Sequence, residues 1–148
     1  MTKAYKLSIV YYLIFSVLLL LSAYMLFDYK IGFSYESVLS YYLGNEEKFI
    51  PAKSILGVLK LVLPHIFVLG LFLMVILHFL VFTKLRYKKS TLSLIYAAFA
   101  VALLEIFTPV MIIGGINFFA YIKLFSFFAL LALILYIFWL LLYSIIYE

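Results

Sequence analysis

Four ionisable side chains lie inside long apolar stretches of this sequence: His65, His78, Glu105 and Lys123. A charge in hydrocarbon is costly, so such residues are candidates for function by default. A carboxylate and an ammonium can pair with each other or bind an ion or solute. An imidazole can ligate haem or hydrogen-bond a neighbouring helix. Cysteine is absent, which excludes disulfides, thiolate metal sites and covalent c-type haem attachment.

Glu105 and Lys123 are placed to meet each other. They flank the tight turn "GGIN" (114–117), and their depths on two antiparallel helices should differ by only about 5 Å. We therefore expect an ion pair that joins these two helices. Two alternatives stay open: a protonated Glu105 with Lys123 extended toward the interface, and a substrate or proton site.

Pro109, in "FTPVMIIGG" (107–115), falls in the same apolar stretch as Glu105. It removes one backbone hydrogen bond and predicts a helix kink four residues after Glu105. Interrupted helices mark binding sites in many transporters, but proline is also common in ordinary spans. The second interpretation is favoured.

The two histidines predict two separate sites. On one straight helix, His65 and His78 are related by a rotation of about 220° around the helix axis, so they point to different faces. They are also roughly 20 Å apart along the axis, so they cannot ligate one haem. A b-type haem would need another axial ligand, which Met111 or a histidine of a second subunit could supply. Interhelical hydrogen bonding is the alternative, and His65 could also meet water at the interface.

Composition dictates the environment of these residues. Of the 148 residues, 70% are hydrophobic and 11% charged, which is more apolar surface than a soluble domain of this length can bury. Apolar runs of spanning length predict an all-α integral membrane four-helix bundle forming a single domain over 1–148. The predicted spans are about 7–27, 64–83, 91–113 and 118–146, with an ordered extracytoplasmic loop over 28–63.

Basic residues predict the orientation. One side of the predicted bundle carries Lys3, Lys6, Lys84, Arg86, Lys88 and Lys89. On the other side, acidic residues offset the lysines. The first side should be cytoplasmic, with both termini inside. This rule explains the net charge of +5 better than nucleic-acid binding does.

The loop itself carries helix-boundary signals. Ser34 should cap a short helix with Glu36 in its first turn, and Gly44 should end it. Ser54 is a second expected cap, before "ILGVLKLVL", which should lie in the interface or extend the second span.

The segment "YYLGNEEKFIPAKSILGVLKLVLPHIF" (41–67), with "LLEIFTPVMI" (103–112) and "AYIKL" (120–124), resembles a group of small, largely uncharacterised proteobacterial inner-membrane proteins with four helices. The shared features are a "YY-x-G-N" loop, a "K-S-x-x-G" segment and a histidine entering the second span. This resemblance implies a bacterial inner membrane and association with respiratory proteins. The helix number and the two histidines also resemble four-helix b-type cytochromes.

Catalytic motifs such as H-E-x-x-H, G-x-S-x-G or a phosphate-binding loop do not occur. We therefore expect a non-enzymatic accessory or assembly subunit of a larger membrane complex, for which a respiratory complex is one option. Its expected partners are the lipid bilayer and other membrane subunits or further copies of this chain, with no nucleic acid. One alternative is a haem b- or quinone-associated electron carrier using His65 or His78. Another is ion or small-solute transport using Glu105 and Lys123.

Overall fold

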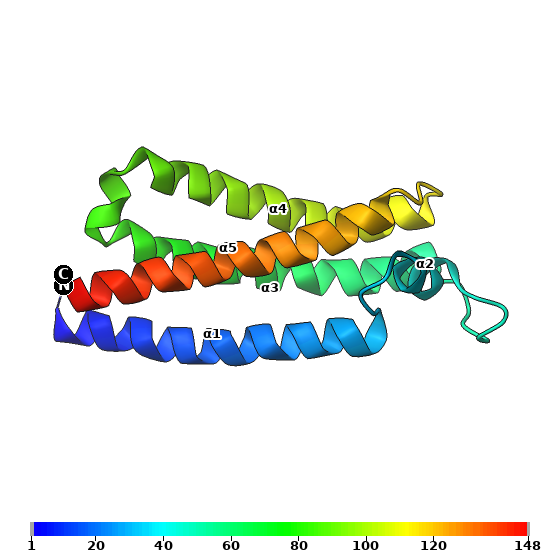
Figure 1. Ribbon diagram of the computed structural model, residues 1–148, viewed down its shortest axis with the longest axis horizontal. Helices are drawn as coiled ribbons and strands as arrows, with labels where there is room; N and C mark the ends of the chain where they lie inside the picture. Colours follow the sequence, from blue (N-terminus) through cyan, green and yellow to red (C-terminus); the bar gives the residue numbers. More distant parts are fainter. Residues whose placement is uncertain (1, 148) are drawn as a thin grey trace.

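The structure, a computed structural model, describes residues 2–147. In this part of the chain it has four long helices, one shorter α-helix and one short 3-10 helix (Figure 1). They are α1 (Lys3–Lys30), α2 (Tyr35–Leu43), α3 (Ile55–Val81), η1 (Lys84–Tyr87), α4 (Lys89–Ile113) and α5 (Phe119–Tyr147). The predicted all-α fold with four long apolar helices is confirmed.

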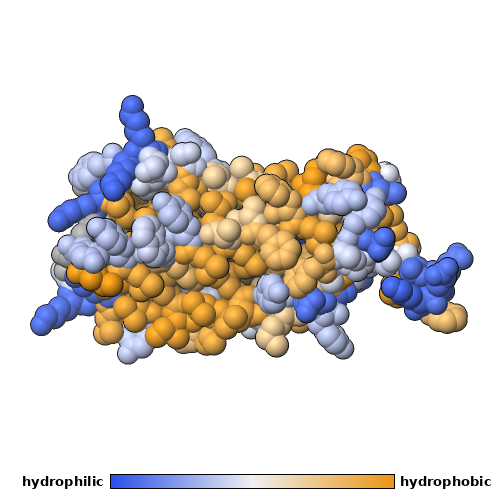
Figure 2. Space-filling model, in the orientation of Figure 1, coloured by the Kyte–Doolittle hydropathy of each residue, from blue (hydrophilic) through white to orange (hydrophobic). Residues whose placement is uncertain are grey.

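The chain is a multi-pass membrane protein. Helices α1, α3, α4 and α5 are each long and apolar enough to cross a membrane. Figure 2 shows an apolar band between two hydrophilic ends on the face that it draws. The start of α1, the end of α5 and η1 lie at one end of the bundle, the terminus end, whereas α2 and the α4–α5 turn lie at the other, the α2 end (Figure 1).

Helices α4 and α5 form the most extensive helix–helix contact in the described chain. Eight of the ten buried side chains in the described part of α5 recur at alternating spacings of three and four residues, as in coiled coils. This stripe comprises Ala120, Lys123, Phe127, Leu130, Ile134, Ile137, Leu141 and Ser144. Opposite it, buried Ala98 and Ala102 let the two helix backbones approach closely. The seam between α4 and α5 is therefore where Glu105 and Lys123 lie.

Helix α1 is packed much more loosely than α5. Its buried residues are Ile9, Leu13, Ser16 and Phe27, so none falls within 17–26. Near the terminus end, the Tyr12 hydroxyl donates to the Phe72 carbonyl over 3.0 Å. Near the α2 end, the rings of Phe27 and Phe127 stack with centroids 3.9 Å apart. Helix α1 is thus held at two places, with a poorly packed stretch between them.

The segment "ILGVLKLVL" extends the helix of the second span, which is one of its two expected arrangements. Helix α3 starts at Ile55, capped by Ser54 as expected, and it continues through Pro64 without ending. Proline leaves the carbonyl four residues earlier without its usual N–H partner. Both Pro64 and Lys60 are exposed, so the freed Lys60 carbonyl faces the surroundings of the bundle rather than its core.

The segment before α3 is ordered, as predicted. Ser34 and Ser37 form a reciprocal capping box at the start of α2, Glu36 lies in its first turn, and Gly44 ends it. Gly44 has φ +85°, and a Cβ there would come within 2.6 Å of the Ala52 backbone nitrogen. This close approach, which only glycine allows, folds the following loop back toward α2.

Candidate functional site

The structure brings Glu105 and Lys123 together in the α4–α5 seam. Their side chains form an ion pair, and the residues are only 8% and 7% exposed. The second carboxylate oxygen of Glu105, Oε2, accepts a hydrogen bond of 2.6 Å from the Ser126 hydroxyl. Ser126 lies one turn beyond Lys123 on α5, so two residues of one helix hold both oxygens of the carboxylate. Such saturation is what a buried charge needs.

Pro109 explains a second part of this cluster. Helix α4 runs through Pro109 to Ile113, and because proline has no N–H, the Glu105 carbonyl loses its normal helical donor. Two side chains replace that donor: Lys123 Nζ at 3.0 Å and the Thr108 hydroxyl at 3.1 Å. A buried carbonyl left unpaired would cost about 1–3 kcal/mol. Lys123 therefore neutralises the Glu105 carboxylate and also donates a hydrogen bond to the backbone carbonyl that Pro109 leaves without a partner. The kink at Pro109 stays a prediction.

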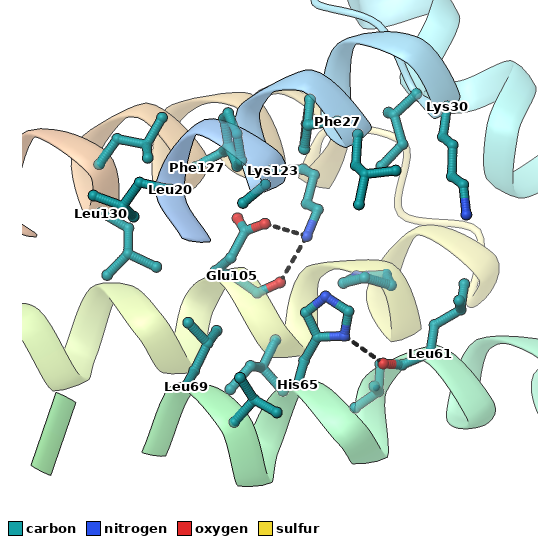
Figure 3. A pocket seen from close by; sticks show the side chains of 18 of the residues that line it. Leu20, Phe27, Lys30, Leu61, His65, Leu69, Glu105, Lys123, Phe127 and Leu130 are labelled. Atoms are coloured by element: carbon teal, nitrogen blue, oxygen red, sulfur yellow. Dashed lines mark hydrogen bonds and ion pairs between the residues drawn. The ribbon is translucent and has the colours of Figure 1, made fainter. Parts of the chain in front are cut away.

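Beside this cluster lies an elongated cavity of about 400 Å³ (Figure 3). It is lined by the loosely packed stretch of α1, by α3 and by the α4–α5 seam. Most of its wall is leucine, isoleucine, valine and phenylalanine. Its polar or ionisable lining residues are Ser22, Lys30, Tyr41, Tyr42, His65, Glu105 and Lys123. All except Ser22, which lies near mid-length, belong to the half of the cavity at the α2 end.

Helix α2 covers the polar half of the cavity. Its residues Tyr41 and Tyr42 contribute to the lining, and Tyr42 is 3% exposed. Burial, followed by the negative charge of Glu105, raises the pKa of Tyr42 well above its usual value. The phenol is therefore a neutral hydrogen-bonding group beside the charged pair.

His65 and His78 lie in different environments. His65 is part of the cavity lining, and its Nδ1 is 2.6 Å from the Leu61 carbonyl oxygen. Because a carbonyl can only accept, Nδ1 carries the hydrogen in this bond, which leaves Nε2 free. In Figure 3 the ring projects toward the Glu105–Lys123 pair. His78 is exposed outside the cavity lining and makes an edge-on contact with Phe82.

A family model described as a transmembrane helical domain matches residues 32–148 of the chain. The chain belongs to the Aq_1264_TM family. Neither a curated protein nor a solved structure matches the chain. Among the described helices, the family match covers α2, α3, α4 and α5, and it begins after α1 has ended. The ion pair thus lies wholly within the family domain. The cavity is closed on one side by α1, from outside the matched region.

Several site residues were not expected from sequence. Ser126 and Thr108 could have been found, because each is three residues from a charged residue on the same helix. Lys30 and Tyr42 gave no such signal. Their place in the cavity depends on how α1 and α2 pack against the bundle, which helical periodicity does not describe. Within residues 2–147, no group of three or more metal-ligating side chains clusters.

Proposed function

We propose that this protein is a non-enzymatic accessory protein of the membrane that holds one amphipathic bilayer molecule in the cavity beside α1. The observation that carries the proposal is the cavity itself. Its volume is about 400 Å³ and its wall is apolar, with the polar groups confined almost entirely to the half at the α2 end. Ligand pockets of this size and composition typically enclose a mainly apolar molecule with one polar part.

The packing of α1 supports access from the bilayer. No side chain of residues 17–26 is buried, and this stretch supplies Leu19, Ser22, Ala23 and Leu26 to the lining. Separating α1 locally from α3 would therefore disrupt few contacts. Segments with few buried apolar contacts open at the lowest free-energy cost, so a lipid-sized molecule can reach the cavity laterally.

Native mass spectrometry of the full chain, purified in a mild detergent, tests the proposal. We expect one bound amphiphile per chain in the wild type. Ala23→Trp should lose it, because the indole would fill the cavity next to α1. Leu21→Trp is the matched control, since Leu21 is exposed on the same helix and lies outside the lining. Equal retention by both variants would show the proposal to be wrong.

The accessory role extends this proposal to partners. Glu105 and Lys123 satisfy each other within one seam, an arrangement that suits joining two helices better than chemistry on a substrate. We place the protein in a bacterial inner membrane, with both termini cytoplasmic and other membrane subunits or further copies as neighbours. Stoichiometric co-purification of another membrane protein, for example a respiratory subunit, would support this role. Recovery of the chain alone from mild detergent would contradict it.

A quinone- or haem-associated electron carrier is a second candidate, because His65 lies in the cavity wall. The described lining residues include no second histidine and no methionine, and Met111, which is 39% exposed, lies elsewhere. A haem at His65 would therefore need its other axial ligand from a second copy or another chain. Absence of a Soret band after haem-sufficient expression would rule out the haem form of this candidate.

Transport is a third candidate, because an intramembrane ion pair borders the cavity. Proton or solute flux into liposomes that Glu105→Gln abolishes would favour it. Both carboxylate oxygens already have partners within the protein, so we expect no such flux.

A further inference from the structure

We infer that the amphiphile in the cavity is a lipid with an anionic head, which binds at Lys30 while its chain lies along the apolar half. This inference rests on the proposed function, since it names the chemistry of the molecule that the cavity holds. The ionic side chains in the cavity wall are Lys30, Glu105 and Lys123.

Glu105 and Lys123 neutralise each other, which leaves Lys30 as the uncompensated charge. No acidic residue other than Glu105 lines the described cavity, and no described side chain forms an ion pair with Lys30. In Figure 3 the Lys30 side chain projects from the end of α1 toward the cavity. The wall therefore carries a net positive charge at its α2 end, where an anionic group would be stabilised.

The lining extends far enough along α1 and α5 for a polar head and part of an acyl chain. From Lys30 to Leu19 the α1 lining spans eleven residues, or roughly 16 Å along the helix. Lys123 to Ile134 spans the same distance on α5. At the α2 end the lining is basic and phenolic, whereas at the far end it consists of apolar residues such as Leu19, Leu130 and Ile134.

The hydrogen bonding of His65 distinguishes between a lipid with an anionic head and a neutral quinone as the ligand. Its Nδ1–H is already donated to the Leu61 carbonyl, so a neutral imidazole offers only the acceptor Nε2 to the cavity. A quinone head has carbonyl oxygens, which also only accept, and the two would not bond. An acidic phospholipid head such as a phosphate monoester can instead donate its O–H to Nε2 while its anionic oxygens meet Lys30. A fatty-acid carboxylate has no O–H and would meet Lys30 alone.

A binding titration of the full chain in detergent tests the inference, with native mass spectrometry counting bound molecules. The anionic probes are oleate and dioleoyl phosphatidic acid, which distinguish a carboxylate from a phosphate head. Oleyl alcohol and diolein are their neutral matches, and a short-chain ubiquinone is the competing class. We expect the wild type to prefer at least one anionic probe over its neutral match by about tenfold, as one charge-assisted hydrogen bond provides.

Lys30→Gln should reduce that preference to about twofold or less, because the anionic head loses its charged partner. Lys60→Gln is the matched control: Lys60 is an exposed lysine of α3 outside the lining, and its loss should change neither affinity. Lys30→Arg should retain the preference. Circular dichroism checks that the variants are folded.

Equal binding of anionic and neutral probes would overturn the inference but leave the proposed function standing. An anionic preference that survives Lys30→Gln would also overturn it. If no probe binds the wild type, and Ala23→Trp alters nothing that co-purifies, both the inference and the proposed function fail.

Discussion

At the scale of single residues, Lys123 makes two different interactions with Glu105. It neutralises the Glu105 carboxylate and donates to the Glu105 carbonyl that Pro109 leaves without a helical donor. Removing the ammonium would leave a buried charge and a buried carbonyl without their main partner. We therefore expect substitutions of this pair to be strongly coupled.

Lys123→Met should lower the free energy of unfolding by about 3–5 kcal/mol, because it leaves the Glu105 carboxylate buried and unpaired. The double variant Glu105→Gln/Lys123→Met should recover a large part of this loss. Thermal unfolding in detergent, followed by circular dichroism, measures the coupling. Lys60→Met on the exposed face of α3 serves as the control. If the single and double variants are equally destabilised, the pair has no energetic role.

The raised pKa of Tyr42 predicts that the stability of the protein falls at alkaline pH. Its pKa is raised in the folded protein by burial and by the charge of Glu105, so the folded state holds the phenolic proton more tightly than the unfolded chain does. This contribution is complete below the unfolded value of 10.0 and is lost as the pH rises toward the folded value. Stability should therefore fall above about pH 10.

In Tyr42→Phe this part of the alkaline loss should disappear. Melting curves from pH 8 to 11 would measure it, with Tyr29→Phe, an exposed tyrosine, as the control. An unchanged alkaline slope in Tyr42→Phe would contradict the placement of this phenol.

At the scale of elements, contacts at the C-terminal end of α2 hold this helix in place. Gly44 has φ +85° and no room for a Cβ, and the loop after it is tied back by the Lys53 N–H, which donates to the Tyr42 carbonyl over 2.9 Å. We expect Gly44→Ala to loosen α2 and the loop together. Hydrogen exchange should rise over residues 35–53 and remain unchanged in α4 and α5. Protection lost equally throughout the bundle would show that α2 is not a separate unit.

The sequence predicted most of these elements, because their signals are local. Runs of apolar residues specify the long helices, Ser34 and Gly44 bound α2, and the turn at 114–117 is short enough to align Glu105 with Lys123 from helical rise alone. The early start of α3 was only partly foreseen. Pro64 suggested a boundary, but an exposed proline within a long apolar helix does not end it.

The cavity could not be predicted in the same way. It exists because α1 contacts the bundle near Tyr12 and again at Phe27, but not through any buried residue in between. That pattern depends on the relative geometry of three helices, whereas the apolar residues of α1 look equally suited to lipid or to protein. Lys30 and Tyr42 belong to the site for the same reason, and no spacing in the sequence marks them.

At the scale of the whole molecule, two hydrophilic ends enclose an apolar band on the face seen in Figure 2. The terminus end carries lysines in the first two turns of α1 and in the α3–α4 connection, which favours the cytoplasmic side for this end. The natural chain has no cysteine, so single cysteines can report the orientation without background labelling.

In intact cells, Glu47→Cys should react with a membrane-impermeant maleimide, whereas Ser90→Cys should react only after permeabilisation. These residues lie in the loop after α2 and at the start of α4, at opposite ends of the bundle. The reverse labelling pattern would place the termini outside.

We propose above all that the cavity beside α1 holds an amphiphile of the bilayer. Photocrosslinking with a fatty acid that carries a diazirine near the end of its chain tests this most directly, with peptide mapping by mass spectrometry. We predict label on lining residues of the apolar half, namely Leu19, Leu20, Leu130, Leu131 and Ile134, and its loss in Ala23→Trp. Label confined to outward-facing residues such as Phe67, Met74 and Trp139, and unchanged in that variant, would contradict the account.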